Sequence, residues 1–355
     1  MKRLHIPIVL LFALLLPVSL QAQDTALNVV ASTTIIADVA RNVGGDLVNV
    51  TALIPPDSDV HAFQPAPQDA VTIQQADVVL VNGANLEENL LSLIDNAATA
   101  EPVIVSGGVP VLAFGSHDHD HEDEDHVAEE EHDHDDDAHE HDAEGTIGHL
   151  GEDADCGDTE NHDDEAGEHE HDHGACDPHV WMNPHNVEIW ADNIAAAFAA
   201  ADPANADTYH ANAEAYAEQL EALDAELETM FASIPEANRV IITNHEFLAY
   251  LAASYDLEIV GTVLPSVSTL AEPAPQEVAA LIETIEATGV AVIFGEVSNP
   301  NALTQVIAQD VGDVEVVSLY SESLSGPDGA AATYIDYMRT NAQLIVDALG
   351  GSTES

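Results

Sequence analysis

Positively charged residues are scarce in this sequence. Only 5 of its 355 residues are Lys or Arg, against 66 Asp and Glu, so the formal net charge at pH 7 is −61. A chain of this charge repels polyanions, which excludes nucleic acid and anionic membrane surfaces as partners and favours cations. Outside the insert described below, we interpret the remaining acidic excess as a solvated surface.

Long apolar runs are also scarce, with one at the N-terminus. Lys2 and Arg3 precede an apolar stretch that ends at Leu16, and Ala22 is a suitable cleavage point. The stretch is too short to span a bilayer comfortably, and no cysteine for lipid attachment lies near the cleavage point. We therefore interpret residues 1–22 as a signal peptide and expect an exported, periplasmic protein that is soluble after its removal.

Cysteine is nearly absent, since Cys156 and Cys176 are the only two. In an exported protein an even pair favours a disulfide bond. Such a bridge would tie the end of an acidic insert to the segment that follows it. The alternative, in which both thiols bind metal, stays open.

That insert, residues 116–174, is rich in the residues that bind cations. Between His117 and His173 it holds 13 of the chain's 19 His together with 27 Asp and Glu. Its apolar residues are too sparse to offset the entropy of ordering the chain, so we expect it to be disordered without metal. We interpret it as a loose store for several weakly bound cations. The alternative is a solvated acidic spacer.

The rest of the chain alternates between two patterns. Apolar runs typical of strands occupy residues 27–32, 48–54, 77–83, 103–105, 239–243, 257–263, 290–294 and 314–319. Helical spacing marks residues 33–43, 67–75, 86–96, 187–201, 206–231, 246–255, 273–287, 300–310 and 330–349. This alternation predicts an α/β fold with a mostly parallel sheet in each half.

One predicted helix is much longer than the others. Its apolar spacing runs from Ala206 to Phe231, and a helix of about 25 residues spans about 40 Å. Such a helix can join two lobes rigidly, where a flexible linker cannot. We therefore expect an N-terminal lobe over residues 23–201, a connecting helix over 202–234 and a C-terminal lobe over 235–355.

Three histidines and one glutamate stand at the ends of predicted elements. His61 follows the strand at 48–54, His179 follows the insert, and His245 and Glu322 follow later strands. In open α/β sheets, ligands bind at the carboxyl ends of the strands. Three imidazoles and one carboxylate suit tetrahedral Zn²⁺, whereas manganese prefers more oxygen donors. The alternative for each histidine is a partly buried, hydrogen-bonded side chain.

Four segments resemble, in order, the metal-ligand motifs of the metal-binding solute-binding proteins of ABC transporters. They are Pro55–Pro65, Asp177–Pro184, Asn244–Leu251 and Leu319–Leu324, and the segment Phe294-Gly295-Glu296 also resembles a strand end near the family's site. The resemblance implies two α/β lobes, a long connecting helix and a metal in the cleft between the lobes. It implies as ligands His61, His179, His245 and Glu322.

The third and fourth motifs bear on which metal is bound. Zinc members of the family tend to carry His at the third position and manganese members Glu, so His245 favours zinc. An acidic, His-rich insert before the second motif is also similar to that of the zinc-uptake members. Glu322 departs from the usual Asp at the fourth position, since it keeps the charge but adds a methylene.

The resemblance predicts a monomeric periplasmic carrier without enzymatic activity that delivers Zn²⁺ to the permease of an ABC transporter. A manganese or broad divalent-metal carrier is the alternative within this class. A zinc hydrolase is an alternative of another class, because three histidines and an open fourth position also describe catalytic zinc. However, His245-Glu246 lacks the second His of an HExxH helix. A metal buffer or adhesin that meets no transporter is a further alternative.

Overall fold

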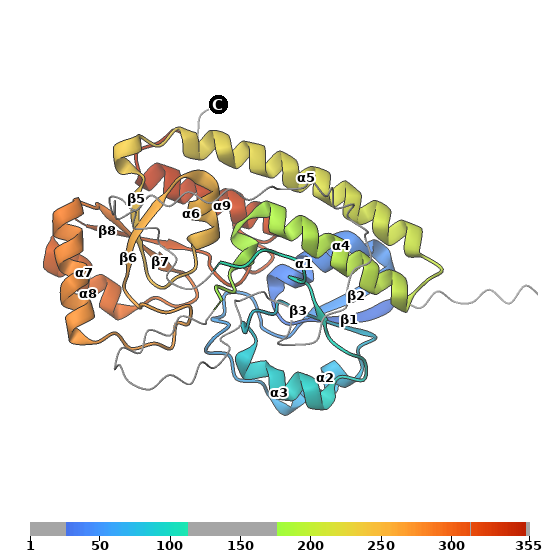
Figure 1. Ribbon diagram of the computed structural model, residues 1–355. Coiled ribbons are helices and arrows are strands. Elements are labelled where there is room, and N and C mark those ends of the chain that lie inside the picture. Colours follow the sequence, from blue (N-terminus) through green and yellow to red (C-terminus); the bar gives the residue numbers. More distant parts are fainter. Residues whose placement is uncertain (1–25, 113–175, 313, 353–355) are drawn as a thin grey trace, which may run out of the picture.

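The computed structural model describes residues 26–112, 176–312 and 314–352 (Figure 1). The predicted signal peptide, the insert at 116–174 and Cys156 lie outside the described residues. Within the part of the chain that is described, no helix has both the length and the apolar character needed to cross a membrane.

The first half forms a parallel four-stranded sheet in the order β2-β1-β3-β4. Its elements are β1 (Leu27–Ala31), α1 (Thr34–Gly44), β2 (Val48–Ala52), α2 (Pro67–Gln74), β3 (Val78–Val81), α3 (Glu88–Ala97) and β4 (Val103–Ile104). Helices α2 and α3 lie on one side of this sheet and α1 on the other (Figure 1). The strand β3 is buried along its whole length, as its unbroken apolar run predicts.

The second half repeats this arrangement with the order β6-β5-β7-β8, again all parallel. Its elements are β5 (Val240–Thr243), α6 (Ala249–Tyr255), β6 (Glu258–Thr262), α7 (Pro275–Thr288), β7 (Val292–Glu296), α8 (Ala302–Val311), β8 (Glu315–Leu319) and α9 (Tyr334–Ala348). Helices α7 and α8 lie at the outer side of the sheet, and α6 and α9 lie toward the rest of the molecule (Figure 1). The predicted α/β class, with a mostly parallel sheet in each half, is confirmed.

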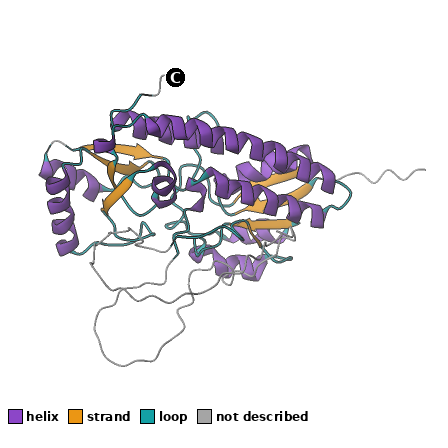
Figure 2. Cartoon of the chain, turned by 45° about the horizontal axis from the view of Figure 1, so that its top comes forward, coloured by secondary structure: helices purple, strands orange, loops and turns teal. Residues whose placement is uncertain are grey.

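One long helix connects the halves. Helix α4 (Pro184–Ala201) packs with α1 in the first half, and α5 (Ala206–Ala232) runs along both halves of the molecule (Figures 1 and 2). Helix α5 contacts α4 and α1 at one end and α9 and α6 at the other. Its buried face is the stripe that the 3.6-residue spacing predicts: Tyr209, Ala213, Tyr216, Leu220, Leu223, Leu227 and Phe231.

One hydrophobic core crosses from the first half to the second. It includes Ile36 of α1, Leu220 of α5 and Ile345 of α9. A smaller, separate core, which includes Ile285 of α7 and Ile307 of α8, fills the outer side of the second sheet. The shared core therefore fixes the inner faces of both halves against each other through α5.

Two helices begin three and four residues later than their apolar spacing predicts. Helix α6 was expected from Glu246 but begins at Ala249, because the intervening residues turn away from β5 and the backbone N–H of Glu246 donates to Ser266 O. Helix α9 was expected from residue 330 but begins after Thr333, whose side chain accepts a hydrogen bond from the backbone N–H of Asp336 and caps the helix. Capping and turn chemistry thus decided these boundaries.

Candidate metal centre

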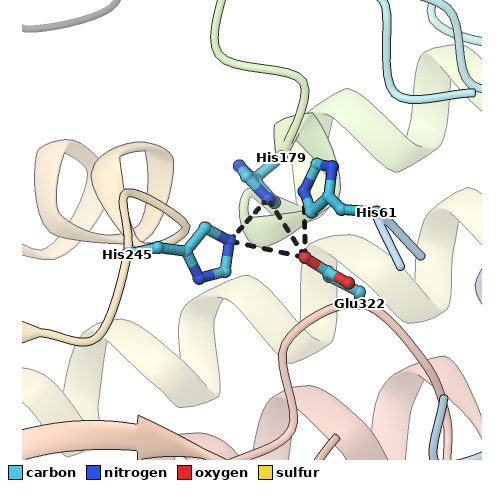
Figure 3. A group of neighbouring side chains, drawn as sticks. All are labelled: His61, His179, His245 and Glu322. Atoms are coloured by element: carbon cyan, nitrogen blue, oxygen red, sulfur yellow. Dashed lines mark hydrogen bonds and ion pairs between the residues drawn. The ribbon is translucent and has the colours of Figure 1, made fainter. Parts of the chain in front are cut away.

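The four predicted side chains meet between the two halves (Figure 3). One donor atom from each of His61, His179, His245 and Glu322 lies within 4.8 Å of the other three. His61 comes from the loop after β2, and His179 directly precedes a short 3₁₀ turn that leads into α4. His245 follows β5 and Glu322 follows β8. Residues far apart in the sequence therefore converge, as the strand-end argument predicts.

A single carboxylate oxygen faces all three imidazoles. The distance from Glu322 Oε1 is 3.0 Å to His61 Nε2, 3.4 Å to His245 Nε2 and 3.9 Å to His179 Nε2. The Nε2 atoms of His179 and His245 are 3.3 Å apart. Figure 3 shows these atoms pointing toward a common centre.

The group is almost closed to solvent. His179, His245 and Glu322 are fully buried, and His61 is 8% exposed, so the site meets solvent on the side of His61. Two aromatic rings extend this shielding: Trp181 lies edge-on to His179 and Phe247 stacks on His245, with ring centroids 5.3 Å and 5.2 Å apart. Electrostatic interactions among the four groups are therefore weakly screened.

Two of the imidazoles are oriented by carboxylates on their outer sides. Asp177 Oδ1 lies 2.7 Å from His179 Nδ1, and Glu296 Oε1 lies 2.8 Å from His245 Nδ1. An ionised carboxylate can only accept, so each Nδ1 carries the proton and each Nε2 presents its lone pair to the centre when the ring is neutral. This role of Asp177 was not predicted from the sequence, although its place two residues before His179 was the available signal.

Glu296 also joins three strand ends. Its Oε1 accepts a hydrogen bond from Asn244 Nδ2 at 2.6 Å, and its Oε2 accepts one from Ser321 Oγ at 2.6 Å. Thr304 Oγ1 in turn donates to Asn244 Oδ1 at 2.8 Å. This buried network fixes the ends of β5 and β7 and the loop after β8, and with them the position of His245.

Glu322 uses its two oxygens differently. Oε2 accepts a hydrogen bond from the backbone N–H of Val60 at 2.7 Å. Oε1, which faces the imidazoles, has no hydrogen-bond partner of acceptable geometry among the described residues, and neither has His61 Nε2. Buried polar atoms are rarely left without a partner, so this pair indicates that the site takes up a further group.

The charges in the site shift the pKa of its members strongly. Burial opposes protonation of His245, yet the nearby carboxylates of Glu296 and Glu322 raise its pKa to about 10. The pKa of His179 is raised as well, because Asp177 and Glu322 outweigh the effect of burial. Burial opposes ionisation of Glu322, but the three histidines hold its pKa well below the usual range. Without a metal ion, the site therefore takes up protons.

Two further histidines of the described residues are not part of this group. The side chains of His185 and His210 are exposed, and Trp181 and Trp190 are core residues. Asp59, two residues before His61, accepts hydrogen bonds from Thr269 Oγ1 and from the backbone N–H of Ala62. Because Cys156 is outside the described residues, its pairing with the buried Cys176 stays a prediction.

The fold and the site together define a solute-binding protein of the metal-binding class. Over residues 29–348 the chain matches the family described as zinc-uptake complex component A, periplasmic, and it belongs to this family. Substrate-binding proteins of metal ABC transporters bind metal ions and work with a membrane permease, and they are not enzymes. The zinc hydrolase considered above is therefore excluded.

Two curated relatives have names that specify different metals. The iron-binding protein YfeA of Yersinia pestis is 28% identical, over 92% of this chain and 88% of its own length. The manganese ABC transporter substrate-binding lipoprotein of Streptococcus gordonii is 26% identical, over 93% and 91%. The family description, which is periplasmic, and the name of the Streptococcus gordonii relative, which is a lipoprotein, are consistent with a location outside the cytoplasm.

Solved structures with the same fold align over most of the chain. The manganese-bound periplasmic metal-binding protein of Candidatus Liberibacter asiaticus aligns with a TM-score of 0.67 and 26% identity, over 91% of this chain and 99% of its own. A cadmium-bound form of that protein aligns equally well. The periplasmic zinc-binding protein of Treponema pallidum aligns with a TM-score of 0.69 at 22% identity, a likeness of fold alone.

Proposed function

We propose that this protein is a periplasmic carrier that binds one Zn²⁺ tightly and delivers it to the permease of an ABC transporter. His61, His179 and His245 supply three Nε2 ligands, and Glu322 supplies one carboxylate oxygen, Oε1. The observation that supports this most directly is the convergence of these four atoms in a nearly closed space.

The donor arrangement is poorly satisfied without a cation. In their neutral forms, His179 and His245 direct two lone pairs at each other across 3.3 Å. The carboxylate oxygen of Glu322 adds negative charge at the same place. A divalent ion removes this repulsion. Because zinc accepts imidazole nitrogen and carboxylate oxygen at about 2.0–2.2 Å in a tetrahedral arrangement, one ion can bind all four donors after small movements of the side chains.

The hydrogen bond to Val60 favours zinc over manganese. Since Glu322 Oε2 accepts from the backbone N–H of Val60, Oε1 is the oxygen directed at the three imidazoles. The site then offers three nitrogens and one oxygen, which suits a four-coordinate zinc ion better than manganese, an ion that prefers more oxygen donors. A manganese or broad divalent-metal carrier remains the second candidate, because relatives are named for manganese and iron.

The ligands come from both halves of the chain. His61 and His179 belong to the proposed N-terminal lobe at 23–201, and His245 and Glu322 to the proposed C-terminal lobe at 235–355, with the connecting helix at 202–234 between them. An ion bound by all four would hold the lobes together, so we propose that binding and lobe closure are linked. We propose that a single copy of the chain performs this function, because one chain supplies every ligand.

Native mass spectrometry with elemental analysis, on protein purified from the periplasm, tests the proposal. We expect one tightly held zinc ion per chain that survives dialysis. A competition titration should then show zinc displacing manganese at equal concentrations. Manganese or iron as the retained ion would refute the zinc assignment, and the absence of any retained ion would refute the proposed carrier function.

A further inference from the structure

A buried tyrosine of the second half holds the backbone next to His179 in the first half. Tyr250 is the second residue of α6 and is 4% exposed. Its hydroxyl donates a hydrogen bond to Asp177 O at 2.8 Å and accepts one from the backbone N–H of Leu112 at 2.9 Å. One side chain thus binds two backbone segments that are 65 residues apart in the sequence (177 minus 112).

These two segments are also bonded to each other. The backbone N–H of Asp177 donates to Leu112 O at 2.9 Å. Together with the two bonds of Tyr250, this closes a junction of three hydrogen bonds between α6 and the chain on each side of residues 113–175. The backbone of Asp177 therefore has both its N–H and its C=O fixed.

The side chain of Asp177 depends on this fixed backbone. Its Oδ1 accepts from the backbone N–H of His179 at 2.9 Å and lies 2.7 Å from His179 Nδ1. Its Oδ2 is buried and has no hydrogen-bond partner among the described residues. Among the described residues, both hydrogen bonds to this carboxylate come from His179, so the position of the Asp177–His179 pair follows from where the junction places the backbone of Asp177.

The short segment that carries Tyr250, residues 245–250, also carries His245. His245 and Tyr250 are five positions apart, and the turn between them is held by the bond from the Glu246 backbone N–H to Ser266 O. This segment therefore places one imidazole directly and fixes, through Asp177, the direction of the other. The Nε2 atoms of His179 and His245, which lie 3.3 Å apart, are therefore both positioned by residues 245–250.

We propose that Tyr250 is a positioning residue for metal binding, which holds Asp177 so that it orients His179 toward the ion. The proposal rests on the proposed function of the site. The Tyr250 hydroxyl does not touch the metal, and its loss leaves all four ligands in place. Its loss lets the Asp177 backbone shift, so that His179 samples other orientations and the ion escapes faster.

Tyr250→Phe tests this, with Tyr255→Phe as the matched control. Tyr255 lies on the same helix and is 5% exposed, but its hydroxyl donates to Asp224 Oδ1 on α5, away from the ligands. Because outer partners of metal ligands typically contribute about 10–100-fold to affinity and Tyr250 acts one step further out, we expect Tyr250→Phe to speed zinc release about threefold to tenfold. Release is followed with a chromophoric chelator, and Tyr255→Phe should match wild type.

The Tm of the metal-free protein separates positioning from a general loss of stability. We expect both variants to lower that Tm by similar amounts, since each removes one buried hydroxyl. If zinc release is equally fast in the two variants, Tyr250 is a structural residue only and the proposal is wrong. If wild-type protein holds no metal tightly, the proposed function itself fails instead.

A second comparison tests the route through Asp177. In an Asp177→Ala background the carboxylate that orients His179 is already gone, so adding Tyr250→Phe should change zinc release by less than about twofold. An undiminished effect of Tyr250→Phe in that background would show that the tyrosine acts by another route and would overturn the proposal.

Discussion

The backbone N–H of Val60 donates to Glu322 Oε2 at 2.7 Å, between residues that are 262 positions apart. This bond turns the other oxygen, Oε1, toward His61, His179 and His245. It also places the carboxylate of the second half against the loop that carries His61. The hydrogen bond therefore determines which of the two oxygens is directed toward the histidines.

Loss of any one proposed histidine ligand should abolish tight binding. Replacing His61, His179 or His245 by Ala removes one of four donors, and we expect zinc affinity to fall by at least about 100-fold, more than for the loss of an outer partner. The rise in Tm that zinc gives to wild-type protein should largely disappear. Titration calorimetry and thermal melts measure both effects.

His185 provides the control for this series. Its side chain is 59% exposed and contacts Glu188 and Asp224 rather than the site. His185→Ala should leave zinc affinity unchanged within about twofold, as is usual for surface substitutions. Wild-type affinity in all three ligand variants would show that the site is elsewhere.

Substitutions of Glu322 should separate its two oxygens. In Glu322→Gln one oxygen becomes an NH₂ group, which cannot accept a hydrogen bond or bind a cation. The amide therefore loses either the hydrogen bond from the backbone N–H of Val60 or the contact with the ion. Glu322→Asp keeps both acceptors and shortens the side chain by a methylene. We expect Gln to weaken zinc binding more than Asp does, but less than loss of a histidine, because water can fill the fourth position.

A crystal structure of the zinc-bound protein checks this assignment directly. Glu322 Oε1 should lie about 2.0–2.2 Å from the ion. If Asp and Gln at position 322 bind zinc equally well, the carboxylate charge is irrelevant and the site is a three-histidine site.

Glu296→Gln should weaken binding without touching the metal. Glu296 accepts from His245 Nδ1, Asn244 Nδ2 and Ser321 Oγ, so an amide NH₂ must face at least one donor. We expect a loss of zinc affinity of about 10–100-fold and a loss of stability of about 1–3 kcal/mol. The exposed Glu258→Gln is the matched control, and equal behaviour of the two variants in titration calorimetry and denaturant unfolding would contradict the network.

Zinc binding should release protons at neutral pH. In the metal-free protein the pKa of His245 is raised to about 10 by Glu296 and Glu322 against the effect of burial, so zinc must displace its proton. We expect at least about one proton released per zinc at pH 7 and an affinity that rises with pH toward 10. Calorimetry in buffers with different ionisation enthalpies counts the protons, and a count near zero would contradict the raised pKa.

The same shift predicts the opposite pH dependence for the stability of the metal-free protein. Because the folded pKa lies above the unfolded value of about 6.5, protonated His245 stabilises the fold fully below pH 6.5, and this contribution is lost as pH rises toward 10. The Tm of metal-free protein should therefore fall over this range more than the Tm of His245→Gln. If the Tm of the two metal-free proteins falls equally with pH, His245 is not the cause of the pH dependence.

The sequence by itself determined the fold class and the candidate ligands. Unbroken apolar runs predict strands that are buried on both faces, and a spacing of 3.6 residues predicts helices, so their alternation predicts parallel sheets covered by helices. The stripe on α5 from Tyr209 to Phe231 is the clearest case. The positions of His61, His179, His245 and Glu322 followed from strand ends and from four ordered motifs.

The tertiary structure alone decided how those side chains are oriented. The donor to Glu322 is the backbone N–H of Val60, and Tyr250 binds backbone atoms of Leu112 and Asp177. Every non-proline residue carries the same backbone groups, so no residue type in the sequence reveals such a partner. These contacts also join positions 73 to 262 residues apart, and such pairs meet only because both sheets pack along α5. Local patterns in the sequence carry no information about that packing, which is why the candidate ligands could be named from the sequence and their orientation could not.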